Sequence, residues 1–244
     1  MDITVVAAHA MQQDAARLQG IAQNLGNALT PGYKKQLSVG AGFAAQFSAA
    51  GAASAPAQAS QALGAPMRVV LDASSGTLRG TGNGSDVAID GDGFFELSTP
   101  SGPLYTRRGA LRLDAAGRLV GPQERPVMGS SGTVVLNGDP FKIMPNGDIV
   151  QGGSTVARLR LVRFQEPGLL EPAGAGSYAL GGATLDEAPF VPRLRIGYEE
   201  NSNVDSAREM VNMTETMRHF EAMQKIVQGY DELLEKSIRK LGEF

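Results

Sequence analysis

Cysteine and tryptophan are absent from this 244-residue sequence, and histidine occurs only twice. Without cysteine the chain can form neither disulfide bonds nor thiolate metal sites, and its compartment cannot be inferred from redox chemistry. His9 and His219 have no second histidine or carboxylate cluster at ligand spacing, so we expect solvated or interface side chains. The sequence therefore predicts no catalytic site, no cofactor and no metal.

Positive charge and long hydrophobic runs are also scarce. A net charge of −3 provides no basic surface for nucleic acid. The first sixteen residues contain no lysine or arginine, and Thr4 and His9 interrupt their apolar run, which argues against a secretory signal peptide. No apolar run approaches the ~18 residues of a membrane span. We expect one large or two small domains that do not span a membrane.

The most regular feature is an apolar stripe at helical spacing near the C-terminus. Asn203 or Asp205 can cap the start of this helix, and Ser206 with Glu209 has capping-box spacing. The pattern predicts a helix from Asn203 to about Leu241, longer than a core of this size requires. The stripe steps by four and three residues, as a coiled-coil seam does, through Met213, Met217, Phe220, Gln224, Val227, Asp231, Leu234, Ile238 and Leu241.

A second stripe follows the N-terminus and consists of Met11, Ala15, Leu18, Ala22, Leu25 and Leu29. Residues 30–32, Thr-Pro-Gly, are predicted to end this helix. Gly20 and Gly26 each cost ~1 kcal/mol relative to alanine, so the isolated helix would be marginal. Such stripes usually pack on a globular core. Because these two lie at opposite ends of a strand-rich chain, we expect them to pair with each other or with other copies.

Residues 36–67 contain no charged side chain and are rich in alanine, glycine, serine and glutamine, which predicts a flexible or induced segment. Within it, residues 37–45 read as a short strand followed by G-x-G-x-x-A, the start of a dinucleotide-binding pattern. No acidic residue follows before Asp72, and no βαβ unit follows, so chance is the better explanation. A dinucleotide-dependent enzyme using Gly40 and Gly42 is a less favoured alternative.

After Arg68 the sequence changes to short runs of β-forming residues separated by turn formers. Asn137-Gly138 and Asn146-Gly147 each stand between apolar runs, which predicts two hairpins. No segment of helical period interrupts, so we expect an antiparallel β domain of about 100 residues. The predicted strands are 87–89, 94–97, 104–106, 110–113, 118–120, 133–136, 141–143, 148–150, 156–164 and 193–196.

The middle region offers little chemistry. Residues 90–93, Asp-Gly-Asp-Gly, begin like a calcium loop, but Ser101 stands where the loop needs its last carboxylate, so a tight hairpin turn is the better interpretation. Arg107-Arg108 is most simply a solvated pair or a contact surface. A glycan-binding β module with helical arms is a further alternative, although the lack of tryptophan argues against an aromatic stacking platform.

Motifs at both ends and in the middle carry a family resemblance. Residues 23–34 (QNLGNALTPGYK), 202–213 (SNVDSAREMVNM) and 86–95 (DVAIDGDGFF) resemble, in this order, signatures of the bacterial flagellar rod and hook proteins. Gln23, Gly26 and Thr214 depart from the usual pattern without removing a stripe residue. The signature positions are Asn24, Asn27, Thr30, Pro31, Gly32, Tyr33, Ser202, Asn203, Val204, Glu209, Met210, Val211, Asn212 and Met213.

The resemblance implies a structural subunit, not an enzyme. Its expected partners are copies of itself, other flagellar rod proteins and the flagellar export apparatus, with no nucleic acid and no small-molecule substrate. It implies export without a cleaved signal peptide and assembly into the rod that crosses the periplasm. The ending, residues 231–242, is more similar to the proximal rod type, with the distal rod type as the alternative.

The expected fold class is α+β, with long N- and C-terminal helices that form a coiled-coil-like assembly layer and a central antiparallel all-β domain between them in the sequence. The expected boundaries are an N-terminal assembly helix (1–36), a linker (37–80), the β domain (81–197) and a C-terminal assembly helix (198–244). The subunit interface is predicted at the apolar members of the two stripes: Met11, Ala15, Leu18, Ala22, Leu25, Leu29, Met213, Met217, Phe220, Val227, Leu234, Ile238 and Leu241.

Overall fold

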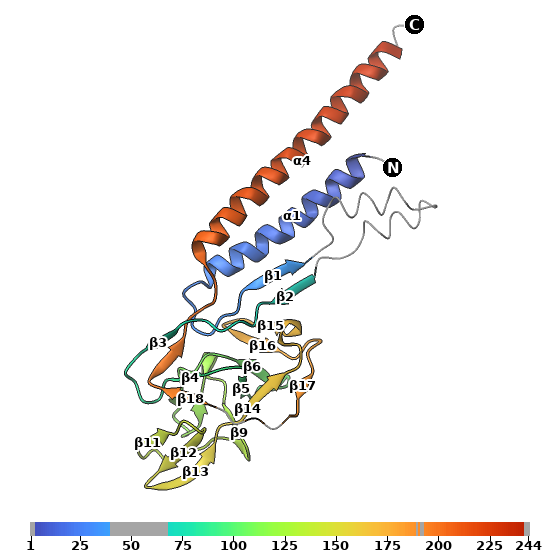
Figure 1. Ribbon diagram of the computed structural model, residues 1–244. Coiled ribbons are helices and arrows are strands. Elements are labelled where there is room, and N and C mark those ends of the chain that lie inside the picture. Colours follow the sequence, from blue (N-terminus) through green and yellow to red (C-terminus); the bar gives the residue numbers. More distant parts are fainter. Residues whose placement is uncertain (1–2, 40–67, 189, 191–192, 242–244) are drawn as a thin grey trace. The chain divides into compact units, whose positions relative to one another are not determined.

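The computed structural model describes residues 3–39, 68–188, 190 and 193–241 (Figure 1). The chain divides into two compact units. We call them the terminal unit (Met1–Leu25, Gln36–Val69 and Asp205–Phe244) and the core unit (Gly26–Lys35 and Val70–Val204). Long helices in the first and short antiparallel strands in the second make this an α+β protein, as expected. The pattern around Gly40 and Gly42 lies outside the described residues.

The terminal unit contains two helices, α1 (Ile3–Gly26) and α4 (Ser206–Leu241). It also contains β1 (Gln36–Val39), which pairs with β2 (Arg68–Leu71). The first two residues of β2 belong to this unit and the last two to the core unit. None of the described helices combines the length and the apolarity of a membrane span.

The helix α1 ends at Gly26, before the predicted stop at Thr30. Glycine favours helix ends, and Asn27 then opens a turn in which the Thr30 N–H donates to the Asn27 carbonyl at 3.0 Å. Leu29 lies in this turn and is 97% exposed. Leu29 therefore does not continue the helical stripe, which ends at Leu25.

Asp205, one of the two predicted caps, begins α4. Its Oδ1 atom accepts hydrogen bonds from the backbone N–H groups of Ala207 at 3.0 Å and Arg208 at 3.2 Å. These bonds satisfy two donors that the first turn of a helix leaves free. Arg239 occupies the last turn, where its positive charge suits the negative pole of the helix.

The core unit is built from short strands in antiparallel pairs. Its largest sheet has the order β15-β16-β6-β5-β14-β17, a second has the order β11-β12-β13, and the remaining pairs are β18-β4, β19-β3, β7-β8 and β10-β9. The bounds are β3 (Leu78–Gly80), β4 (Val87–Ile89), β5 (Phe94–Leu97), β6 (Leu104–Thr106), β7 (Arg112–Leu113), β8 (Leu119–Val120), β9 (Met128–Gly129), β10 (Gly132–Thr133), β11 (Phe141–Ile143), β12 (Asp148–Gln151), β13 (Ser154–Arg158), β14 (Leu161–Phe164), β15 (Glu171–Pro172), β16 (Ser177–Ala179), β17 (Leu185–Asp186), β18 (Leu194–Ile196) and β19 (Tyr198–Glu200). Two short 3-10 helices span Pro122–Glu124 and Pro167–Leu169.

The predicted turns have mixed outcomes. Asn146-Gly147 joins the antiparallel pair β11 and β12 as expected, and Gly147 takes the positive φ of 86° that such a turn requires. Asn137-Gly138 does not form a hairpin, because β10 pairs back with β9. The turn at residues 90–93 is not a hairpin either, since β4 pairs with β18 while β5 pairs with β6 and β14. Local turn chemistry does not distinguish a hairpin from a crossing between sheets.

Strand β5 separates two hydrophobic clusters. Successive side chains of a strand point to opposite faces. Phe95, fully buried, joins the cluster that includes Leu97 and Leu119, whereas Phe94 joins the cluster that includes Phe164. The ring centroids of Phe94 and Phe164 lie 5.5 Å apart in an edge-on arrangement. All four residues of β5 are therefore buried, unlike a strand with one face in water.

Candidate functional site: the paired chain ends

The helices α1 and α4 pair in opposite directions within the terminal unit (Figure 1). Two polar contacts define their register: the Asn24 amide donates to Glu209 Oε2 at 2.9 Å, and Asp14 Oδ2 lies 2.5 Å from His219 Nδ1. Each contact is ten residues from the other along both helices, in opposite senses. The two ends of the chain thus cover part of each other.

Asn24 ties three segments of the terminal unit together. Besides Glu209, its side chain donates to the Gln36 carbonyl at 2.9 Å and accepts from the Gln36 N–H at 2.8 Å. Asn24 and Glu209 are each 1% exposed, so these bonds form out of water, where a lost partner is costly. This geometry accounts for two signature positions, Asn24 and Glu209.

The contact between Asp14 and His219 is the second polar pair of the hairpin. The Asp14 side chain is 8% exposed and the His219 side chain 44% exposed. The pair is an ion pair only when the imidazole is protonated and a neutral–charged hydrogen bond otherwise. His219 is thus an interface histidine, one of its two expected roles, whereas the His9 ring forms a hydrogen bond with the Gln13 side chain of its own helix at 3.1 Å.

The covered face of α1 lies one residue away from the predicted stripe. Its buried residues are Val6, Ala7, Ala10, Asp14, Ile21 and Asn24, whereas Ala15 and Ala22 are exposed and Met11, Leu18 and Leu25 are half-buried. One residue corresponds to a rotation of about 100° around the helix. The intramolecular partner of α1 therefore covers the neighbouring face and leaves the edge of the predicted stripe accessible.

The helix α4 is covered only along its first two thirds. Met213, Phe220 and Val227 of the predicted stripe are half-buried, whereas Met217 is 46% exposed. All residues from Asp231 to Lys240 are exposed, including Leu234 at 45% and Ile238 at 70%. The structure thus brings three of these stripe residues against its own chain and leaves three others in water.

The overhang follows from the register of the hairpin. With 24 residues in α1 and 36 in α4, the matched polar pairs place Ile3, where α1 begins, opposite about Tyr230. The residues from Asp231 onward continue for ~16 Å at 1.5 Å per residue. We call this segment, residues 231–241, the α4 overhang.

Signature residues also join the chain ends inside the core unit. The Lys35 N–H donates to Asn203 Oδ1 at 2.7 Å, and the Asn203 amide donates to the Asp72 carbonyl at 2.9 Å. Gly32 has a φ of +67°, and a Cβ there would lie 2.6 Å from the Arg108 backbone nitrogen. Only glycine fits this approach without displacing backbone. Asn203, one of the predicted caps, serves here instead of capping α4.

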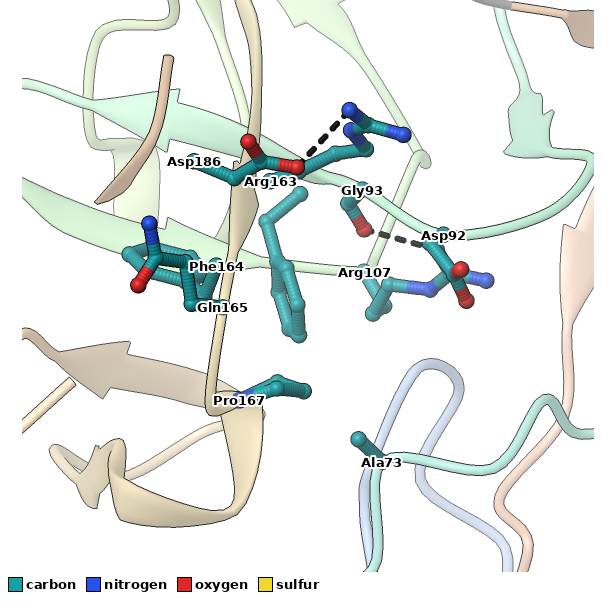
Figure 2. Close-up of a pocket in the computed structure, with 10 residues that line it drawn as sticks. Ala73, Asp92, Gly93, Arg107, Arg163, Phe164, Gln165, Pro167 and Asp186 are labelled. Carbon is teal, nitrogen blue, oxygen red and sulfur yellow. Dashed lines mark hydrogen bonds and ion pairs between the residues drawn. The ribbon is translucent and has the colours of Figure 1, made fainter. Parts of the chain in front are cut away.

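The core unit contains a cavity of about 210 Å³ (Figure 2). Arg163 lies in its wall and pairs with Asp186 at 2.7 Å, while Arg107 donates to the Gly93 carbonyl at 2.6 Å. The described residues of its lining include no serine, threonine, lysine or histidine, and their two carboxylates are Asp92 and Asp186, of which Asp186 is paired with Arg163. Among the described residues, no three metal-ligating side chains gather.

Comparison with known proteins decides the family. The family profile "Flagellar hook protein FlgE/F/G D1 domain" matches residues 88–156, and "Flagellar basal body rod FlgEFG protein C-terminal" matches residues 195–240. The flagellar basal-body rod protein FlgG of Buchnera aphidicola (Schizaphis graminum) is 32% identical over 176 residues, 67% of each chain. The chain belongs to the flagellar rod and hook family. It is a structural subunit of the flagellar basal-body rod.

Other rod relatives match almost from end to end. The rod protein FlgF of Mesorhizobium japonicum is 28% identical over 249 residues, covering 99% of this chain and 98% of the relative. The rod protein FlgG of Bacillus subtilis is also 28% identical, over 257 residues, covering 93% and 94%. The family is thereby confirmed, whereas identity alone does not separate the FlgF type from the FlgG type.

Two charged side chains of this chain make contacts that the sequence did not reveal. The prediction that Arg107 is solvated is wrong, because its side chain is 3% exposed and pairs with Glu200 at 2.7 Å. A pair of adjacent arginines carries no signal of burial, because a buried partner 93 residues away cannot be recognised locally. Lys34 also pairs with Glu200, at 2.7 Å, and its side chain is 2% exposed. Its position directly after the signature turn at residues 30–33 is the one local indication of this structural role.

Proposed function

We propose that this rod subunit is of the proximal, FlgF type and that its terminal helices form the assembly layer of the rod. The support for assembly is the apolar surface that the helical hairpin leaves uncovered, above all on the α4 overhang. The support for the proximal type is the sequence of residues 231–242, which is more similar to that type. The distal, FlgG type is the alternative.

Burial of apolar side chains supplies the driving force for this assembly. Leu234 and Ile238 lie one turn apart in the overhang and are about half to two thirds exposed. Full burial of such a side chain stabilises a complex by about 1.5–3 kcal/mol before the costs of association. A contact that joins the overhang of one subunit to a different surface on the next propagates as a helical filament when its rotation does not close into a ring.

We further propose that the subunit acts in the periplasmic part of the basal body and reaches it through the flagellar export apparatus. Membership of the rod family supports this placement. Its partners there are other copies and neighbouring rod proteins, joined through the outward faces of α1 and α4.

The assembly proposal is tested by Ile238→Asp in the full chain, with Ser237→Asp as the matched control. Both positions are exposed on the overhang, but only Ile238 belongs to the stripe. A carboxylate buried without a partner at the interface should abolish rod assembly and swimming. Ser237→Asp should assemble. Normal swimming of the Ile238→Asp strain, with the variant protein recovered in the rod, would overturn the proposed interface.

Cysteine cross-linking identifies the neighbours, because the natural chain has no cysteine. A single cysteine at exposed Ala15 or Ile238 should form bonds to cysteines placed in adjacent rod proteins, and one at Ser237 should not. Complementation then separates the two types. The gene should restore motility to a strain of its own species that lacks the proximal rod protein, and rescue only of a strain that lacks the distal protein would reverse the assignment.

A further inference from the structure

Three charged side chains are buried together inside the core unit. Glu200 receives Lys34 Nζ on Oε1 and Arg107 Nε on Oε2, each at 2.7 Å. The side chains of Lys34, Arg107 and Glu200 are 2%, 3% and 0% exposed. One carboxylate thus neutralises one of two cations that have left water completely.

Backbone groups complete the coordination of all three side chains. Lys34 Nζ also donates to the Ser74 carbonyl at 2.6 Å, and the Gly76 N–H donates to Glu200 Oε1 at 2.8 Å. Arg107 Nη1 donates to the carbonyl of Gly91 at 2.7 Å as well as to that of Gly93. Burial lowers the pKa of Lys34, and the charge of Glu200 opposes that shift. We call Lys34, Arg107 and Glu200 the buried charge cluster.

The cluster joins segments that are far apart in the sequence. Glu200 lies 166 residues after Lys34 and 93 residues after Arg107. It is the last residue of β19, the final strand of the core unit. Every other strand of the unit, including the six-stranded sheet, therefore precedes the carboxylate in the chain. Glycine at position 76 permits this closure, because a Cβ there would lie 2.0 Å from the Asn201 carbonyl oxygen.

Two cations buried without a counter-charge oppose folding far more than a completed pair favours it. We propose that Glu200 is a folding latch: the strands of the core unit cannot close around Lys34 and Arg107 until β19 supplies this carboxylate. Folding of the core unit is then all-or-none and includes the segment 26–35 and the last strand. A chain in which β19 is missing or displaced keeps its core strands open.

The test uses the full chain carrying Glu200→Gln, with the adjacent Glu199→Gln as the matched control. Glu199 pairs at 3.0 Å with Arg79, whose side chain is 60% exposed. Breaking the buried cluster should reduce the ratio of folded to unfolded core unit about 100-fold or more. Because Arg79 stays in water and the Glu199 side chain is 10% exposed, breaking this pair should change that ratio less than about fivefold. Urea unfolding followed by pulse proteolysis measures both ratios.

Hydrogen exchange on the same proteins tests the all-or-none character. In Glu200→Gln, amides of β5, β6 and β14 should lose protection together with those of Gly32 and Gly76. Loss of protection confined to residues near 76 and 200, while β5, β6 and β14 exchange as in the wild type, would overturn the latch.

If Glu200→Gln does not fold, a double variant still distinguishes uncompensated charge from the loss of hydrogen bonds. If uncompensated charge is the cause, adding Lys34→Met removes one stranded cation, and Lys34→Met/Glu200→Gln should be at least as stable as Glu200→Gln alone. If the cause is only lost hydrogen bonds, the effects of the two substitutions should add, and the double variant should fall below both single variants. Additive losses would contradict the latch.

Discussion

The two units of this protein differ in where they place energetically unfavourable groups: one buries charged side chains and the other exposes apolar ones. The core unit buries even charged groups and satisfies them internally, so that Glu200 is fully buried with two cations. The terminal unit leaves apolar side chains in water, with Ile238 at 70% exposure. A closed network with internal partners suits a body that folds alone, and uncovered apolar stripes suit a surface that another subunit covers. Four measurements test this difference between the units, in order of decreasing expected effect.

The first prediction concerns the packing of the core unit. Phe95→Ala removes a fully buried ring from the larger cluster and should cost about 3–5 kcal/mol of unfolding free energy. Val135→Ala, at a position 60% exposed, should change it by less than about 0.5 kcal/mol. Urea denaturation with a probe of the β structure measures both. A loss below about 1 kcal/mol for Phe95→Ala would show that the core unit repacks freely.

The second prediction weakens the hairpin of the terminal unit. Asn24→Ala removes the amide that serves Gln36 and Glu209, and should destabilise the pairing of α1 with α4 by about 1–3 kcal/mol. Exposed Gln19→Ala is the control. Hydrogen exchange in the first turns of α4 measures the effect, which should leave β5 and β6 unchanged. An equal loss of hydrogen-exchange protection in α4 and in β5 and β6 would contradict the division into two separately stabilised units.

The third prediction concerns alkaline pH and Tyr178. Burial raises the pKa of Tyr178, and its hydroxyl oxygen accepts from the Lys34 N–H at 2.7 Å. The unfolded state loses this phenolic proton near the ordinary value of 10.0, whereas the folded state retains it. This contribution is complete below pH 10 and falls as pH rises toward the folded-state pKa. Tyr178→Phe should lose ~1–3 kcal/mol at neutral pH and should show a weaker decline between about pH 9.5 and 11.

Comparison of the two proteins isolates Tyr178, since Lys34 is common to both and titrates in each. Chemical unfolding at closely spaced pH values measures the difference. Parallel stability curves above pH 9.5 would mean that Tyr178 ionises as readily in the folded protein as in the unfolded one.

The fourth prediction is the smallest and concerns an exposed hairpin. The Arg158 hydrogen bond to Asp148, at 2.5 Å between β12 and β13, lowers the pKa of that carboxyl. Its contribution is present above the ordinary pKa of 3.8 and is lost as pH falls through the lower folded-state value. Asp148→Asn should flatten the acid side of the stability curve only slightly. Hydrogen-exchange rates of the β13 amides, measured in both proteins from about pH 2 to about pH 5, test this expectation.

Sequence patterns predicted the helices better than their surroundings. The spacing of apolar residues identified α1 and α4, because a 3.6-residue period is a local property. The apolar stripe on α1 lies one residue away from the face that is buried within the chain, because that buried face includes the polar side chains of Asp14 and Asn24. Polar side chains that pair across a helix interface are invisible to a rule that searches for apolar ones.

The strands show the same limit. Val87–Ile89, Phe94–Leu97 and Leu104–Thr106 lie where β-forming residues predicted them. Short strands such as β3 and β19 were missed, because each is stabilised by its partner across more than 100 intervening residues. Their residues, among them Arg79 and Glu200, have no β-specific pattern.

By itself the sequence determined the family, the two terminal helices and the β-rich character of the middle, because signatures, helical periods and turn formers are written in neighbouring residues. The three-dimensional arrangement was needed to see that Arg107 is buried, that Asn24 binds Glu209 and that α4 extends beyond the end of α1. Each of these depends on two segments that are distant along the chain. The energy of a buried charge or amide is set by the partner that reaches it, and no single stretch of sequence contains both.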